Sequence, residues 1–332
     1  MSRRLRVMIT DFVAEPLEQE RAVLDGVAEV VALQAAGEAD LAGRVDEADA
    51  LMVYHEIALG AATIARLRQC RVISRCGVGY DNVDLAAARA RDIPVCNVPD
   101  YGTGDVADAA IGLAVGLARG AFFLNSRLRS GRGTWTYRQA APLRRLQGAV
   151  FAVVGLGRIG TAAALRARAL GMDVVFYDPY KPDGYDKAVG VRRAEMLEEL
   201  LAQAFVLSLH CPLTEETHHL IRAETLDLMP MGSYLVNTAR GQVVDTAVVP
   251  AAIASGRLAG VGLDVLEVEP ARDDDPLLVA WRDPDHPAHH RLVITPHTAF
   301  YSEQSFDDLR RKGAETCRRA LLGQPLRNVV NA

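Results

Sequence analysis

The chain has 332 residues, and half of them are hydrophobic, which is enough to fill the cores of two ordinary domains. Its 37 basic and 42 acidic residues give a net charge of -5, so we expect no broad positive surface that binds nucleic acid or an anionic membrane. These values exclude neither enzyme nor scaffold, but they disfavour nucleic acid and membrane as partners.

Short β-rich runs alternate with helical stretches along the first 98 residues. The runs are 5–10, 28–33, 50–54, 72–75 and 93–96. A second alternating series has its runs at 149–154, 172–177, 205–209, 233–236, 260–265 and 291–294. Such alternation is typical of parallel sheets with helices on their faces. The sequence therefore predicts the α/β class, with two doubly wound parallel-sheet units in tandem.

Three further segments complete the predicted organisation. Residues 105–130 are expected to form one long linking helix, whose glycine and alanine content favours burial or an interface over a membrane span. Residues 303–322 have helical spacing and are expected to pack on the first unit. Residues 272–275 and 283–290 are predicted to be solvated loops.

Two features predict the cellular compartment. The apolar run after the N-terminal arginines ends at Asp11, which is too short for a secretory signal. The five cysteines form no CxxC pair and are odd in number, which favours small buried side chains in a reducing environment. We therefore expect a cytoplasmic protein.

The strongest local motif is a GxGxxG sequence, which follows a β-rich run and opens a helix. Gly155 permits the tight turn, Gly157 lets the backbone approach a pyrophosphate, and Gly160 allows close packing of helix and strand. Backbone amides near Arg158 and Ile159 would point at the anion. The motif predicts a dinucleotide-binding site rather than a plain structural glycine turn.

Asp178 strengthens this prediction, because it lies 18 residues after Gly160 at the end of the next predicted strand. There a carboxylate can accept both hydroxyls of the adenosine ribose, and it would repel a 2′-phosphate. NAD is therefore favoured over NADP, although Lys181 nearby points the other way.

Three candidate catalytic residues each follow a predicted strand: Arg240, Glu269 and His297. Arginine offers a charged fork for a carboxylate, histidine exchanges a proton near neutral pH, and a neighbouring carboxylate stabilises the imidazolium. Alone, each residue has a plain alternative as a surface charge, a loop acid or an ordinary histidine. Their joint occurrence after a dinucleotide motif predicts the reduction of a ketone.

His286, His289 and His290 form a second group of histidines, in a loop rich in proline and aspartate. The loop offers no compact ligand set, so we expect solvated side chains rather than a zinc site. No catalytic metal is predicted.

Over nearly its whole length the chain resembles the D-isomer-specific 2-hydroxyacid dehydrogenases. The resemblance rests on the glycine-rich run at 75–84, Asn97-Val98-Pro99, the dinucleotide motif, His210-Cys211-Pro212-Leu213, Asn237-Thr238-Ala239-Arg240-Gly241, and the Glu-Pro and Pro-His motifs. It implies a flavodoxin-like substrate domain of residues 1–98 and 300–332. It also implies that a Rossmann NAD-binding domain of residues 99–299 is inserted in the substrate domain, and that the active site would lie in the cleft between them.

The resemblance also implies residue roles. Arg240 would bind the substrate's carboxylate and keto oxygen, His297 would be the general acid in reduction, and Glu269 would hold His297 protonated. Backbone amides of Val78 and Gly79 would bind the carboxylate. The remaining implied cofactor residues are His210, Cys211, Pro212, Thr217, Thr238, Ala239 and Asp264, the last of which would orient the nicotinamide carboxamide.

Within the family, 176–180, 218–221 and 300–304 resemble the C-terminal-binding-protein branch. That branch has an arginine at the position of Arg75 and a tryptophan at the position of Phe300. Both residues are therefore expected to shape the substrate pocket, and Tyr54 and His55 are expected to line it. The family also implies a homodimer. A small 2-oxo or 2-hydroxy acid is the expected substrate; the alternatives are a phosphorus oxyanion such as phosphite, or an NAD-sensing scaffold that recruits proteins.

Overall fold

A computed structural model describes residues 3–332. The chain forms two compact units: unit 1 contains Met1–Gly102 and Tyr301–Ala332, and unit 2 contains Thr103–Phe300. Unit 2 is therefore a continuous insertion in unit 1. The expected boundaries, after residue 98 and before residue 300, lie close to these.

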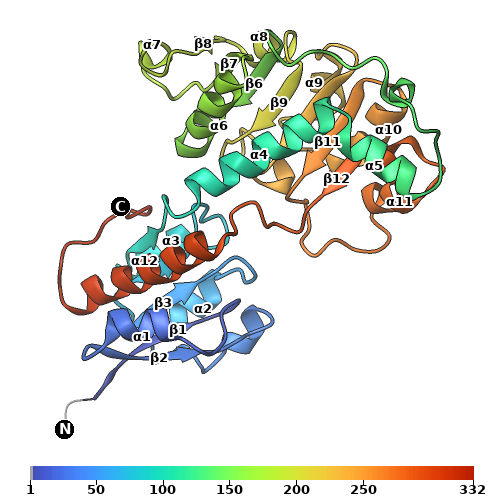
Figure 1. Ribbon diagram of the computed structural model, residues 1–332. Helices are drawn as coiled ribbons and strands as arrows, with labels where there is room; N and C mark the ends of the chain where they lie inside the picture. The colour runs from blue at the N-terminus through green and yellow to red at the C-terminus, as the bar shows by residue number, and fades with distance from the viewer. Residues whose placement is uncertain (1–2) are drawn as a thin grey trace. The chain divides into compact units, whose positions relative to one another are not determined.

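Unit 1 contains a five-stranded parallel sheet of order β2-β1-β3-β4-β5 (Figure 1). Its strands are β1 (Leu5–Ile9), β2 (Ala28–Ala32), β3 (Ala50–Val53), β4 (Ile73–Arg75) and β5 (Val95–Asn97). All five coincide with predicted β-rich runs. The order reverses between β1 and β3, as in a doubly wound flavodoxin-like sheet.

Helices cover both faces of this sheet. They are α1 (Glu18–Leu24), α2 (Ala61–Arg66), α3 (Leu85–Ala90) and α12 (Glu303–Leu321), with a 3₁₀ turn at Glu38–Leu41. Helices α1 and α12 pack on each other, and their apolar residues join Val7, Ile9 and Met52 in one core. Residues of α2 and α3 pack with Met8 and Leu51 on the opposite face.

The C-terminal segment also belongs to unit 1, as expected for 303–322. Beyond α12, Val330 N donates to Val95 O at 2.8 Å, and Asn331 Oδ1 accepts from Val95 N at 2.8 Å. The last residues therefore pair with the edge strand β5, and unit 1 is built from both ends of the chain.

Unit 2 contains a seven-stranded parallel sheet of order β12-β11-β10-β9-β6-β7-β8. Its strands are β6 (Val150–Val154), β7 (Asp173–Tyr177), β8 (Arg192–Arg193), β9 (Val206–Leu209), β10 (Ser233–Asn237), β11 (Leu258–Leu263) and β12 (Leu292–Ile294). Its order reverses at β6, which is the Rossmann arrangement. The two-residue strand β8 carries too little β-rich sequence to be predicted.

The helices of unit 2 are α4 (Thr103–Ala118), α5 (Ala121–Arg129), α6 (Arg158–Ala169), α7 (Tyr185–Val189), α8 (Leu197–Leu201), α9 (Ala223–Asp227), α10 (Val249–Ala254) and α11 (Pro276–Arg282), with 3₁₀ turns at Tyr137–Ala140, Gly241–Val243, Thr246–Val248 and Pro287–His290. Side chains of β6 alternate between two cores: Phe151 and Val153 face α4 and α6, whereas Ala152 and Val154 face the other side.

The prediction of one helix over 105–130 is wrong. Helices α4 and α5 meet at Gly120, whose φ of 66° is left-handed, and their axes differ by 66°. Among the described helices none is by itself long and apolar enough to cross a membrane, although this bent pair passes when taken together. Helix α4 buries Ala110, Leu113 and Leu117 against the sheet, so it is a core helix of unit 2.

Candidate functional site

The candidate site of unit 2 lies at one edge of its sheet. Because all strand pairs are parallel, the loops that follow β6, β7, β9, β10, β11 and β12 leave from the same edge. The dinucleotide motif and the three candidate catalytic residues all follow these strands. Ligands of doubly wound proteins bind at this carboxyl edge.

The turn between β6 and α6 needs glycine at two positions. Gly155 has φ 86°, and a Cβ there would lie 2.7 Å from Cys211 N. A Cβ at Gly160 would lie 2.1 Å from Gly155 O, so this glycine lets α6 pack tightly on the turn. A Cβ at Gly157 would meet no described atom within 4 Å, so the backbone there is open to a ligand. Helix α6 begins at Arg158, directly after this glycine, and Ile159 follows in its first turn.

Asp178 follows β7 and closes the same turn. Its Oδ2 accepts from Leu156 N at 2.8 Å, and its Oδ1 accepts from Tyr180 N at 3.1 Å. A cavity of about 260 Å³ lies beside it, lined by Gly155, Gly157, Asp178, Lys181, Cys211 and Thr217 among others. Asp178, which favours NAD, and Lys181, which points toward NADP, both line this cavity.

The segment after β9 forms the opposite wall of the cavity. His210 Nε2 pairs with Ser208 Oγ at 2.9 Å, whereas its buried Nδ1 has no partner among the described residues. Burial lowers the pKa of His210 to about 4, so the ring is neutral at pH 7. Thr217 Oγ1 donates to Pro212 O at 2.6 Å and shapes the loop. Burial raises the pKa of the Cys211 thiol to about 12, which makes it a packing residue rather than a nucleophile.

Arg240 is held by the loop after β10. Buried Asn237 donates from Nδ2 to Arg240 O at 2.8 Å and accepts from Ala239 N at 3.0 Å. The guanidinium of Arg240 donates from Nη1 to Ala239 O at 2.8 Å. Thr238 places a buried Oγ1 in the same loop, and this atom has no hydrogen-bond partner among the described residues.

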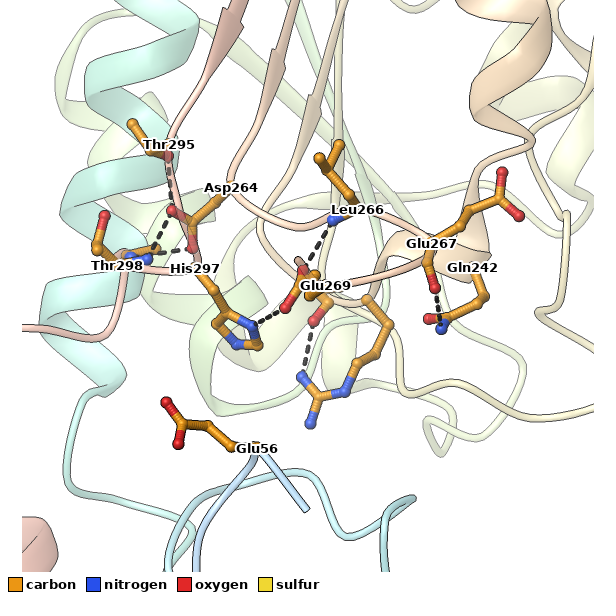
Figure 2. Close-up of polar contacts among 12 residues, drawn as sticks. Glu56, Gln242, Asp264, Leu266, Glu267, Glu269, Thr295, His297 and Thr298 are labelled. Carbon is orange, nitrogen blue, oxygen red and sulfur yellow. Dashed lines mark hydrogen bonds and ion pairs between the residues drawn. The ribbon is translucent and has the colours of Figure 1, made fainter. Parts of the chain in front are cut away.

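His297 and Glu269 form a direct pair (Figure 2). His297 Nδ1 lies 2.6 Å from Glu269 Oε2, although 28 residues separate them in sequence. Glu269 Oε1 accepts from Leu266 N at 2.8 Å, which orients the carboxylate. His297 has φ 51°, and its N donates to Asp264 O at 2.7 Å. The side chains are 26% and 34% exposed, so the pair is accessible to a small molecule.

Asp264 braces the loop that carries His297. Its Oδ1 accepts from Thr295 Oγ1 at 2.6 Å and from Thr298 N at 2.9 Å, and its Oδ2 accepts from Ala299 N at 2.9 Å (Figure 2). The carboxylate is buried, so here it fixes the loop; a role toward nicotinamide stays a prediction. Phe300 is buried at the end of this loop, with its ring centroid 6.3 Å from that of His297.

Further residues, which the sequence analysis did not predict, bind the segment just before Glu269. Gln242 Nε2 donates to Glu267 O at 2.7 Å, and the Glu267 carboxylate binds Thr246 and His219. Glu267 lies two residues before Glu269 in the same motif, which was the available signal. Nothing in the sequence indicates that its side chain reaches the segment after β9.

The candidate substrate residues of unit 1 follow β3 and β4. Arg75 is buried; its Nε donates to Asn82 Oδ1 at 3.1 Å and its Nη1 to Cys76 O at 2.9 Å. Its guanidinium lies over Gly77, where a Cβ would come within 1.6 Å of Nη1. Val78 and Gly79 are half-buried. Their amides donate no backbone hydrogen bond recorded among the described residues, which leaves them suited to an anion.

Tyr54 differs from expectation. Its side chain is fully buried in the core beneath α1 and α12, on the same face of the sheet as Met52. Residues i and i+2 of a strand point to one face, and this continues past the end of β3. The prediction that Tyr54 contacts substrate is therefore wrong for this structure, because its ring packs inside unit 1.

The three clustered histidines have separate structural contacts. His286 Nδ1 accepts from Ala288 N at 3.1 Å, His289 Nδ1 pairs with Trp281 O at 2.8 Å, and His290 Nδ1 pairs with Ser126 Oγ at 2.8 Å. Part of the predicted loop 283–290 is a 3₁₀ turn. Within residues 3–332, no three metal-ligating side chains gather as an ion site requires.

Comparison with known proteins decides the family. The model of the D-isomer specific 2-hydroxyacid dehydrogenase NAD-binding domain matches residues 111–299, more than half of the chain. The chain belongs to this family. The chain is 32% identical to the D-3-phosphoglycerate dehydrogenase of Methanocaldococcus jannaschii over 98% of its own length and 60% of the relative's. It is 33% identical to C-terminal-binding protein 1 of Caenorhabditis elegans over 94% of its length and 43% of the relative's. The chain thus spans about half the length of these curated relatives.

Among solved structures, the chain is similar to D-lactate dehydrogenase of Aquifex aeolicus, complexed with NAD and lactic acid. The TM-score is 0.84, at 27% identity over 96% of both chains. The predicted family, fold class and cofactor are confirmed: this is a Rossmann domain of an NAD-binding family. The site fits NAD, because a Cβ at Gly155 or Gly160 would clash with the backbone, and because His210, whose Nδ1 has no partner among the described residues, lines the cavity.

Proposed function

We propose that the protein is an NAD-dependent dehydrogenase that interconverts a small D-2-hydroxy acid and its 2-oxo acid. The observation that carries the proposal is the 2.6 Å contact of His297 Nδ1 with Glu269 Oε2, at the sheet edge that also bears the dinucleotide motif. NAD, when bound, supplies or accepts the hydride. The chain itself must bind the acid and move one proton.

His297 and Glu269 are the proton-transfer pair in this proposal. A carboxylate that accepts the Nδ1 proton fixes the tautomer and stabilises the imidazolium, so that the proton at Nε2 is the one given to the keto oxygen during reduction. In the reverse direction Nε2 takes the hydroxyl proton. The hydrogen bond from Leu266 N to Glu269 Oε1 keeps the carboxylate oriented through both steps.

Arg240 is the proposed ligand of the substrate's carboxylate and keto oxygen, because a guanidinium binds such oxygens in a fork and keeps its charge at all relevant pH values. Val78 and Gly79 are proposed to donate backbone amides to the carboxylate. Arg75 and Phe300 are proposed to set which substituent the substrate carries. Buried Arg75 offers a second cation for an anionic substituent or for a phosphorus oxyanion.

A second candidate function is an NAD-sensing scaffold that recruits proteins. Its support is the 33% identity to C-terminal-binding protein 1. The paired His297 and Glu269 favour the dehydrogenase, since a scaffold needs no proton relay.

We further propose a cytoplasmic homodimer that binds neither nucleic acid nor membrane. Five free, buried cysteines suit a reducing compartment, and the net charge of -5 disfavours polyanions. The mass in solution at micromolar concentration tests the dimer, and a monomer would contradict it. Cell fractionation tests the compartment.

The test of function is NADH consumption with a panel of 2-oxo acids: glyoxylate, hydroxypyruvate, phenylpyruvate and 2-oxo-4-methylthiobutyrate. Phosphite with NAD is measured alongside. We expect turnover that falls by roughly 10²- to 10⁴-fold in His297→Gln, the range for loss of a general acid, with NADH affinity retained. His286→Gln, which changes a histidine of the distant loop, is the matched control. Tight NADH binding without turnover on any substrate would instead favour the scaffold.

A further inference from the structure

The carboxylate of Glu267 makes hydrogen bonds with two residues that are distant in sequence, Thr246 and His219. Its Oε1 accepts from Thr246 N at 2.9 Å and from Thr246 Oγ1 at 2.7 Å, and its Oε2 lies 2.9 Å from His219 Nε2. Burial raises the pKa of Glu267, but these hydrogen bonds outweigh it and hold the pKa below its usual value. Glu267 is therefore an ionised, fixed anchor point.

The backbone beside this carboxylate is fixed as well. The side chain of Gln242 donates from Nε2 to Glu267 O at 2.7 Å, and the backbone O of Gln242 accepts from His219 N at 2.8 Å. Gly241 packs so closely that a Cβ there would lie 1.9 Å from Leu266 C. We call Glu267, His219, Thr246 and Gln242 the Glu267 network. It joins the loops after β9, β10 and β11.

One side of the Glu267 network leads to the proton-transfer pair. Leu266 N donates to Glu269 Oε1 at 2.8 Å, and Glu269 Oε2 lies 2.6 Å from His297 Nδ1. Glu267 therefore lies between the residue that orients the Glu269 carboxylate and Glu269 itself. A shift of this short segment moves both ends of that hydrogen bond.

The other side of the network leads to the cofactor cavity. His219 lies between Leu220 and the segment of Thr217, and both of these residues line the cavity. His219 has φ 47°, a conformation unusual for a residue other than glycine, and its ring stacks on His218 with centroids 4.1 Å apart. The cavity wall and the Glu269 loop are thus linked through the side chains of His219 and Glu267, and through Gln242.

We propose that Glu267, anchored by His219 and Thr246, is a positioning residue that sets the Glu269–His297 hydrogen bond. The proposal rests on the proposed dehydrogenase function. The His219–Glu267 pair is partly exposed, at 34% and 27%, and such pairs add little to stability. Its effect is therefore expected in the geometry of the proton relay, where a displacement of about 1 Å can cost on the order of 100-fold in rate.

The experiment compares Glu267→Ala, Glu267→Gln and Glu224→Ala. Glutamine keeps an oxygen for Thr246 and an amide for His219, whereas alanine keeps neither. Glu224 is an exposed helix residue that pairs with Arg222, two residues before it, so its variant is the matched control. For Glu267→Ala we expect kcat to fall roughly 10- to 100-fold, with the NADH dissociation constant within about threefold of the wild type. Glu267→Gln should recover most of kcat.

The pH profile separates positioning from a general structural defect. Without a well-placed Glu269 carboxylate the imidazolium is less favoured, so kcat/KM for reduction should halve at a lower pH in Glu267→Ala than in the wild type. The control Glu224→Ala should keep the wild-type profile. Equal kcat and equal profiles for Glu267→Ala and Glu224→Ala would overturn the proposal.

Two further measurements keep the test decisive. If Glu267→Ala does not fold, His219→Gln removes one anchor only and should show a smaller fall in kcat with the same direction of pH shift; no change would refute the inference. If the wild type turns over no substrate, the proposed function fails first. The proposal is then judged by the downfield proton resonance of the His297 Nδ1 hydrogen bond, assigned by its loss in His297→Gln. It should disappear in Glu267→Ala and persist in Glu224→Ala.

Discussion

Acid should destabilise unit 2 through His210, because the folded protein holds this ring neutral. Its pKa is lowered by burial from 6.5 to about 4, so between these values the unfolded chain binds a proton that the folded chain does not. Linkage then requires that the free energy of unfolding decreases as pH falls through this window. The loss amounts to about 2 kcal/mol at pH 5 and about 3 kcal/mol at pH 4, and it is absent above pH 7.

Urea unfolding of the NAD-free protein at pH 7, 6, 5 and 4 measures this loss, with His210→Asn as the comparison. Other titrating groups contribute equally to both proteins, so the difference between the two curves isolates His210. The variant should be less stable at pH 7, because asparagine fills the site poorly. The difference in free energy of unfolding between the wild type and the variant should decrease by about 3 kcal/mol from pH 7 to pH 4. A gap that stays constant with pH would show that the ring is not held neutral.

Three further predictions concern the glycine turn, the cysteines and the metal. Gly160→Ala should abolish NADH binding as measured by fluorescence, because its Cβ would lie 2.1 Å from Gly155 O. Gly37→Ala, at an extended position of unit 1 where a Cβ meets nothing within 4 Å, should bind NADH normally, and equal binding by the two variants would contradict the packing argument. The five thiols should react slowly with an aromatic disulfide reagent until the protein is unfolded, since all are buried and burial raises the pKa of Cys70, Cys76 and Cys211 to about 12; rapid labelling of the native protein would count against it. Prolonged dialysis against EDTA should leave oxo-acid reduction unchanged, whereas activity lost to the chelator and restored by zinc would show that a metal takes part.

Features that depend on local sequence were predictable. Gly155 and Gly160 belong to one short motif between a strand and a helix, and parallel strands bring the residues after them to one edge. Arg240, Glu269 and His297 could therefore be predicted as site residues from the sequence alone, although the distances between them could not. The 2.6 Å contact itself depends on loop conformations, including the left-handed φ of His297, which no spacing encodes.

Features that depend on tertiary packing were harder to predict. Glycine at 120 lies in a run that is otherwise helical, and its left-handed φ separates α4 from α5. Tyr54 was misread although period-two alternation places it with buried Met52, since a tyrosine after a strand also suits a pocket wall. The motif that contains Glu269 also contains Glu267, but it could not indicate the contacts of Glu267, because its partners Thr246 and His219 lie 21 and 48 residues away.

The construction of unit 1 from both chain ends has a consequence during protein synthesis. Helix α12 completes the core above β1 and β3, yet it leaves the ribosome after the whole of Thr103–Phe300. At roughly 5–20 residues per second, that insertion takes about 10–40 s to translate. Throughout this interval the part of the N-terminal sheet that α12 will cover stays exposed beside α1, while unit 2 can already fold as a continuous segment. Chaperone binding to stalled nascent chains should therefore be strongest when they end shortly before residue 303, and it should decline once α12 has emerged.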